Sequence, residues 1–101
     1  MKYAVNVDIS KKSKEEFLQL CTKSEICDKK KILEYMKSFE VYGYSTAYVL
    51  DVVNQEETAL DEVSFTDGDY LWSSSWIYHF EKYNLKLNDD FIAHVLSKAA
   101  E

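Results

Sequence analysis

The amino-terminal segment Lys2–Ile9 alternates between polar and apolar side chains, and its apolar face would carry Tyr3, Val5, Val7 and Ile9. Because successive side chains of a strand point to opposite sides, this alternation predicts a half-buried strand. Apolar residues then recur at helical spacing from Ser13 to Ser38. Within that stretch Ser13 and Glu16 match a capping box, and Asp28 offers a second helix start. The stretch therefore predicts two short helices or one kinked helix.

The composition changes after Val41 to β-branched and aromatic residues, which favour strands. Val41–Val53 predicts a second strand. The polar segment Asn54–Glu57 predicts a loop, so that Thr58–Phe65 would return as an antiparallel neighbour.

The dipeptide Asp67–Gly68 predicts a tight hairpin turn between the third strand and a fourth. A two-residue type I′ turn fits best, because such turns favour Asp-Gly, in which both residues adopt positive φ. This turn would place Phe65 opposite Tyr70 and Val63 opposite Trp72. We expect the face that carries these four residues to belong to the core.

Two helices are predicted after the fourth strand. Apolar positions at helical spacing lie at Trp76, Ile77, Phe80 and Tyr83. A cap at Ser74 or Ser75 would begin this helix, and Asn84 would end it in the left-handed conformation. Asn88 is a favourable cap for a last helix, with Asp89 and Asp90 at the positive end of its dipole. The apolar side of that helix would carry Phe91, Ile92, Val95, Leu96 and Ala99.

The predicted order is one strand, one or two helices, three strands and two helices. This order favours an α+β fold, in which an antiparallel β-sheet of about four strands, including a β-meander, packs on helices. A chain of 101 residues has the size of one domain, so residues 1–101 are expected to form a single domain. No apolar run approaches the length of a membrane span, and the start lacks a signal-peptide pattern. We therefore expect a cytoplasmic protein that does not enter a membrane.

Charge is distributed unevenly along the chain. Residues 1–37 hold nine Lys and six acidic residues, whereas residues 38–81 hold nine acidic residues and no Lys or Arg. A segment of this sign repels nucleic acid and anionic lipid and attracts basic surfaces. We therefore expect no direct nucleic-acid binding and a basic protein as partner. The nine acidic residues are Glu40, Asp51, Glu56, Glu57, Asp61, Glu62, Asp67, Asp69 and Glu81.

The sequence contains little that indicates catalysis. Cys21 and Cys27 lack the spacing of a zinc site or a redox pair, and we expect reduced thiols. His79 and His94 have no suitably spaced nucleophile or metal ligand, so partly exposed helix residues are expected. Phosphate-binding and hydrolase motifs are missing. We therefore expect no enzyme, no cofactor and no metal, although a hydrolase assembled from distant residues stays open.

Three segments in the carboxy-terminal part, Asp67–Ser74, Lys82–Leu85 and Phe91–His94, resemble small bacterial proteins that are similar to the immunity proteins of toxin systems. The resemblance covers about 30 residues and transfers no individual site residue. It implies an inhibitor that holds a toxin, frequently a nuclease, through acidic residues.

The sequence as a whole predicts a small acidic protein-binding module of immunity or antitoxin type. It would block a basic partner sterically and electrostatically, with Tyr70 or Trp72 as a contact anchor. Two alternatives stay open: a nucleic-acid mimic of phage or plasmid origin that inhibits a defence protein, and a structural homo-oligomer such as a homodimer. The expected partner-binding residues are Asp51, Glu56, Glu57, Asp61, Glu62, Asp67, Asp69, Tyr70 and Trp72.

Overall fold

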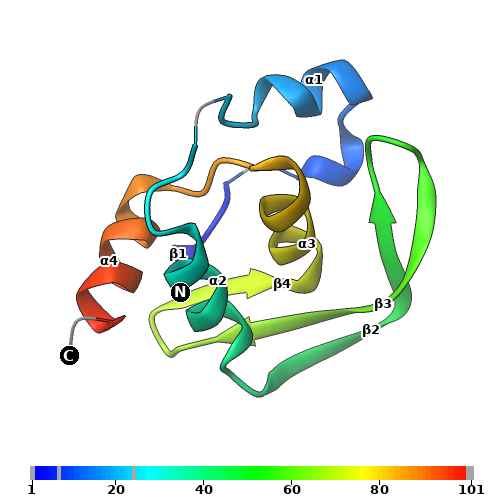
Figure 1. Ribbon diagram of the computed structural model, residues 1–101. Helices are drawn as coiled ribbons and strands as arrows, with labels where there is room; N and C mark the ends of the chain where they lie inside the picture. The colour runs from blue at the N-terminus through cyan, green and yellow to red at the C-terminus, as the bar shows by residue number, and fades with distance from the viewer. Residues whose placement is uncertain (1, 7, 24, 100–101) are drawn as a thin grey trace.

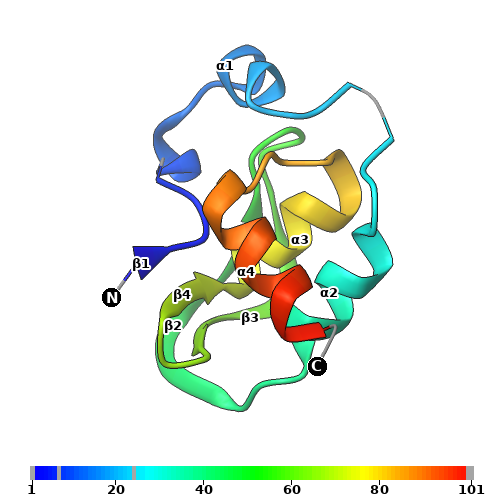
Figure 2. The ribbon, with the colours of Figure 1, turned by 90° about the vertical axis from the view of Figure 1, so that its left-hand side faces the viewer.

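The computed structural model describes residues 2–6, 8–23 and 25–99 and has the α+β fold expected from the sequence. Its four-stranded sheet has the order β1-β4-β3-β2, and α2, α3 and α4 lie together on one side of it (Figure 1 and Figure 2). The strands are β1 (Lys2–Tyr3), β2 (Val41–Asp51), β3 (Glu56–Thr66) and β4 (Tyr70–Ser73). The helices are η1 (Ile9–Lys11, a 3-10 turn), α1 (Lys14–Gln19), α2 (Lys29–Lys37), α3 (Ser74–Tyr83) and α4 (Asp89–Ala99).

The sheet is mixed, which corrects the expected all-antiparallel pairing. β2, β3 and β4 form the predicted antiparallel meander, but β1 pairs parallel to β4. β1 is also much shorter than the predicted strand Lys2–Ile9, of which Val7 lies outside the described residues. The Ala4 amide bonds to Leu71 of β4, whereas the Ala4 carbonyl accepts from the Asn88 amide. The chain leaves the sheet at Ala4, because the Ala4 carbonyl bonds to the connection between α3 and α4 and not to a neighbouring strand.

The β3–β4 turn is longer than the predicted two residues. Thr66 pairs with Leu71 and Phe65 with Trp72, so the register differs by two positions from the expected one. Gly68 has a φ of 101°, but Asp67 does not share the positive φ that a type I′ turn needs. The Asp67 carboxylate instead accepts hydrogen bonds from the amides of Asp69 and Tyr70 and closes a wider loop. A shift of two preserves the face, so Trp72 still points into the core.

Most of the helix ends lie at the residues that the sequence predicted, but not all of these residues cap the helix with their side chains. Ser13 and Glu16 form the capping box of α1, and Asn84 ends α3 at a φ of 61°. Asp28 precedes α2 as predicted, but it has a left-handed backbone and makes no side-chain cap. The cap of α3 is Ser73, not Ser74 or Ser75, because β4 runs directly into the helix and the Ser73 hydroxyl accepts from the Trp76 amide.

One cluster of buried side chains joins the sheet to the helices. Trp72 contributes from β4, Phe80 from α3, Phe91 from α4 and Phe17 from α1. Burying such aromatic side chains supplies the main driving force of a domain this small. Among the described residues, no helix is both long and apolar enough to cross a membrane.

The β2–β3 hairpin bends upward, as the green ribbon in Figure 1 shows, and its tip packs on α3 through Asp51 and Val52. We refer to residues 42–62, the outer part of this hairpin, as the arm. Its pairing register shifts between Tyr44 and Tyr48 and again between Tyr48 and Leu50. Such irregularities increase twist and bend a hairpin. β2 is an edge strand of the sheet, so one side of its backbone has no neighbouring strand among the described residues.

Candidate functional site

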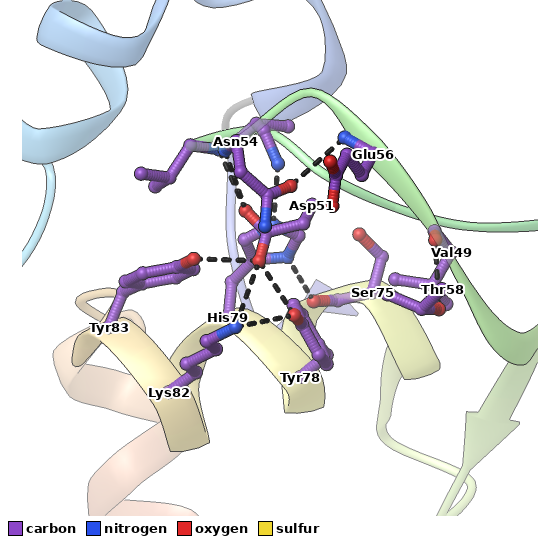
Figure 3. Close-up of polar contacts among 12 residues, drawn as sticks. Val49, Asp51, Asn54, Glu56, Thr58, Ser75, Tyr78, His79, Lys82 and Tyr83 are labelled. Carbon is purple, nitrogen blue, oxygen red and sulfur yellow. Dashed lines mark hydrogen bonds and ion pairs between the residues drawn. The ribbon is translucent and has the colours of Figure 1, made fainter.

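The Asp51 cluster, which consists of Asp51, Tyr78, Lys82 and Tyr83, joins the end of β2 to α3 (Figure 3). The Asp51 side chain is only 1% exposed. The hydroxyls of Tyr78 and Tyr83 each donate to Oδ2 of Asp51 at 2.6 Å, and Nζ of Lys82 lies 3.4 Å from the same oxygen. Three side chains from one helix therefore converge on one carboxylate oxygen.

The second oxygen of Asp51 is also occupied. Oδ1 accepts from the backbone amides of Val53 at 2.9 Å and Asn54 at 3.2 Å. Burial raises the pKa of Asp51, but hydrogen bonds from the two tyrosine hydroxyls and the two amides lower it by more than burial raises it. The net pKa of Asp51 is therefore well below its ordinary range. A carboxylate that is this acidic and this fully hydrogen-bonded is a poor general base. The geometry supports a structural role for Asp51.

His79 is completely buried beside this cluster, which corrects the expectation of a partly exposed residue. Its Nε2 accepts from the amide of Val52, and its Nδ1 lies 2.7 Å from the carbonyl oxygen of Ser75. Nδ1 therefore carries the proton, and the ring is neutral. Burial is the main cause that lowers the pKa of His79. Both ring nitrogens have partners, so His79 links β2 to α3 and is not placed to transfer a proton.

The Asp67 cluster, which consists of Asp67, Tyr35 and His94, lies at the opposite end of β3. Oδ2 of Asp67 accepts from the Tyr35 hydroxyl of α2 and lies 2.7 Å from Nε2 of His94 in α4. Its Oδ1 accepts from the amides of Asp69 and Tyr70, both at 2.9 Å. Burial raises the pKa of Asp67, but these hydrogen bonds lower it to about 2. His94 has a side chain that is largely but not fully buried.

Asp67, Asp69 and His94 are the described residues that could best hold a metal ion, since their ligand atoms lie within 4.8 Å of one another. Aspartate oxygen and histidine nitrogen are suitable ligands for zinc. However, both oxygens of Asp67 already accept hydrogen bonds from within the protein. The arrangement therefore resembles a polar contact between the β3–β4 turn and two helices more than a preformed metal centre.

Three residues of the predicted interface are buried, so their assignment to a partner contact is wrong. Trp72 is 0% exposed, and its indole nitrogen donates to the Met36 carbonyl. Tyr70 is buried against Phe91. Asp51 is enclosed in its cluster. The fold needs these side chains for its own packing and hydrogen bonding.

The remaining six predicted residues do not form one continuous surface. Glu62 accepts from the Ser74 hydroxyl and the Ser75 amide at the start of α3, and Asp67 belongs to its own cluster. Asp69 is exposed in the β3–β4 turn. Only Glu56, Glu57 and Asp61 are exposed together on the arm. Among the described residues, these three carboxylates form no ion pair.

The arm also exposes apolar side chains that were not among the predicted contact residues. Tyr42, Tyr44 and Tyr48 of β2 and Leu60 of β3 are each at least half exposed, with Tyr44 reaching 85%. The sequence shows that this stretch is rich in β-branched and aromatic residues, but the pattern of side chains within β2 does not reveal which of them are exposed. The arm therefore combines exposed aromatic surface with unpaired carboxylates.

The sequence did not predict two sets of contacts inside the protein, those of Asp51 and those of Asp67. Tyr78 and Lys82 are four residues apart on α3, a spacing that places both on one helix face and that the sequence could have indicated. Their partner Asp51 is 27 positions from Tyr78 in the chain. Tyr35 and His94 likewise meet Asp67 only in the folded protein.

Comparison of the chain with protein-family models, curated proteins and solved structures finds no match.

Proposed function

We propose that this protein is a small protein-binding module that docks on a basic partner through the arm and blocks it without chemistry. The observation that carries the proposal is the pairing of exposed Tyr44, Tyr48 and Leu60 with the unpaired carboxylates of Glu56 and Glu57 on one hairpin. No Lys or Arg occurs anywhere in residues 38–81.

The composition of the arm suits a protein interface. Tyrosine contributes a large apolar area and a polar tip with few rotatable bonds, and aromatic residues are enriched among the contacts that dominate binding. Unpaired carboxylates speed the encounter with a cationic partner and select against anionic ones. The free edge of β2 adds backbone groups that a partner strand can bond.

The narrower proposal is that the partner is a basic toxin, and this rests on the resemblance of the carboxy-terminal segments to immunity-type proteins. A nucleic-acid mimic is less well supported, because Asp51 and Asp67 are engaged inside the fold and cannot extend a row of surface charges. Glu56 and Glu57 are instead exposed next to the tip of the arm, and Asp61 is exposed farther along the same strand.

The proposal is tested by comparing two variants of equal charge. The arm variant carries Glu56→Lys, Glu57→Lys and Asp61→Lys. The control variant carries Glu15→Lys, Glu25→Lys and Glu34→Lys, which are exposed positions outside the arm. Each protein is used to capture partners from lysate of the native cell, captured proteins are identified by mass spectrometry, and affinities are then measured with purified components.

We expect wild type and the control variant to bind the same basic protein, and the arm variant to bind it at least tenfold more weakly. Affinity for wild type should also fall as salt is raised from 0.05 to 0.3 M, because salt screens exposed charges. Equal affinity of the arm variant would refute the proposal. A captured partner that is acidic, or binding that does not depend on salt, would do the same.

A further inference from the structure

A groove of about 360 Å³ lies between β3 and α3 at the base of the arm. Val63 and Phe65 of β3 and Ile77 of α3 supply apolar lining, and Leu60 lines it although half of Leu60 is exposed to solvent. Binding sites for apolar groups have this character and this size. The groove is large enough for one or two apolar side chains of another molecule.

The pairing register places two tyrosines of the arm beside the groove. Tyr44 is the cross-strand partner of Val63, and Tyr48 is the partner of Asp61. Directly paired residues of an antiparallel sheet lie on the same face. Since both Val63 and Asp61 line the groove, the two exposed tyrosines extend its apolar surface across β2.

The charges at the groove favour a cationic occupant. Asp61 and Glu81 both line it, and Lys37 is the cation among the lining residues. Lys37 is already paired with Glu81 at 3.1 Å, so the Asp61 carboxylate has no ion pair within the part of the chain that the structure describes. Glu56 and Glu57 add further unpaired negative charge along the same strand. A second copy of this chain would bring another acidic arm, and like charges that face each other are unfavourable.

We propose that this groove receives an apolar side chain from a Lys- or Arg-rich segment of the partner, whose cationic neighbours contact Asp61 and the carboxylates of the arm. This inference rests on the proposed function and makes it more specific. The arm then provides electrostatic attraction, and the groove provides the apolar anchor that holds the complex together. Such a division agrees with the observation that charges mainly govern association whereas buried apolar anchors govern dissociation.

The test uses a fluorescein-labelled peptide in which a leucine and a phenylalanine stand between two pairs of lysines. One control peptide has serine in place of both apolar residues, and the other has glutamate in place of every lysine. The groove variant carries Tyr44→Ser and Leu60→Ser. A matched variant carries Tyr3→Ser and Leu18→Ser, which are exposed positions outside the arm that do not line the groove.

We expect the lysine-apolar peptide to bind wild type and the matched variant with equal affinity, and the groove variant at least tenfold more weakly. Both control peptides should bind wild type at least tenfold more weakly. In ¹⁵N-labelled protein, the peptide should shift amide resonances of residues 60–65 and 74–81. No saturable binding, unchanged affinity of the groove variant, or equal binding of the serine peptide would each overturn the inference.

The groove variant also separates the failure of this inference from failure of the proposed function. If it retains the cellular partner at wild-type affinity while the triple-lysine arm variant loses it, the arm is the interface and the groove assignment is wrong. If both variants retain the partner, the proposed function fails as well. Folding of each variant is checked by its circular dichroism spectrum.

Discussion

Asp51 shows at the residue scale how an acidic side chain can serve the fold. Its two oxygens accept from two backbone amides and two tyrosine hydroxyls, and the Lys82 ammonium lies beside one of them. Among the described residues, no buried side-chain nitrogen or oxygen lacks a hydrogen-bond partner. Removing such a carboxylate leaves several buried donors without an acceptor at once. The free-energy cost of leaving these donors unsatisfied exceeds the net contribution of the lost hydrogen bonds.

Replacing Asp51 with alanine should therefore lower the free energy of unfolding by about 2–4 kcal/mol. Asp61→Ala is the control, because that carboxylate is exposed and has no ion-pair partner in residues 2–6, 8–23 and 25–99, and we expect a change within about 0.5 kcal/mol. Urea denaturation monitored by circular dichroism measures both. Equal stability of the two variants would contradict the structural role of Asp51.

Local capping chemistry decides at the element scale where α1 begins and where α3 begins and ends. The capping box at Ser13 and the left-handed Asn84 could be identified from residue type and spacing. The start of α3 differs by one position because the strand before it is continuous with the helix. Ser74, which the sequence favoured as a cap, is instead bonded to β3, where its hydroxyl donates to the carbonyl of Asp61 and accepts from the amide of Val63.

Ser73→Ala should consequently destabilise the protein by about 1 kcal/mol, because the amide of Trp76 loses its cap acceptor. Ser97→Ala in α4 is the matched control, since Ser97 is exposed within a helix where alanine is at least as favourable. Midpoints of urea unfolding compare the two. A larger loss for Ser97→Ala than for Ser73→Ala would show that Ser73 is not the effective cap.

At the scale of the whole molecule, two carboxylates link the sheet to the helices by hydrogen bonds. Asp51 joins the end of β2 to α3, and Asp67 joins the β3–β4 turn to α2 and α4. Between these points the outer part of β2 exposes Tyr42, Tyr44 and Tyr48. The acidic segment is therefore divided between carboxylates engaged in internal contacts, such as Asp51 and Asp67, and exposed carboxylates, such as Glu56, Glu57 and Asp61.

The stability of the whole protein should decrease in two stages as the pH falls. His79 has a lowered pKa in the folded state, so below about 6.5 the unfolded state binds a proton more readily and stability declines. The folded pKa values of Asp51 and Asp67 are also lowered, to about 2 for Asp67. Their contribution is complete above about pH 4, the ordinary range of an unfolded aspartate, and is lost as the pH falls towards 2.

Urea denaturation at a series of pH values between 7 and 2 measures this profile. Asp67→Asn should weaken the protein at neutral pH and reduce the second decline while leaving the first unchanged. A profile that is flat from pH 7 to pH 3, or one in which Asp67→Asn has the same acid dependence as wild type, would rule out the assigned linkage.

The sequence by itself determined the α+β class, the meander and most helix boundaries, because hydrophobic periodicity and capping depend on residues that are close together in the chain. It also determined the charge of residues 38–81. The tertiary structure alone decided that β1 pairs parallel to β4, that Trp72 and Tyr70 are buried, and which acidic residues remain free. The exposure of a side chain depends on neighbours from distant segments. Asp51 and Glu56 are therefore equivalent as charges in the sequence, yet Asp51 is enclosed against α3 whereas Glu56, on the other side of the same hairpin turn, is exposed.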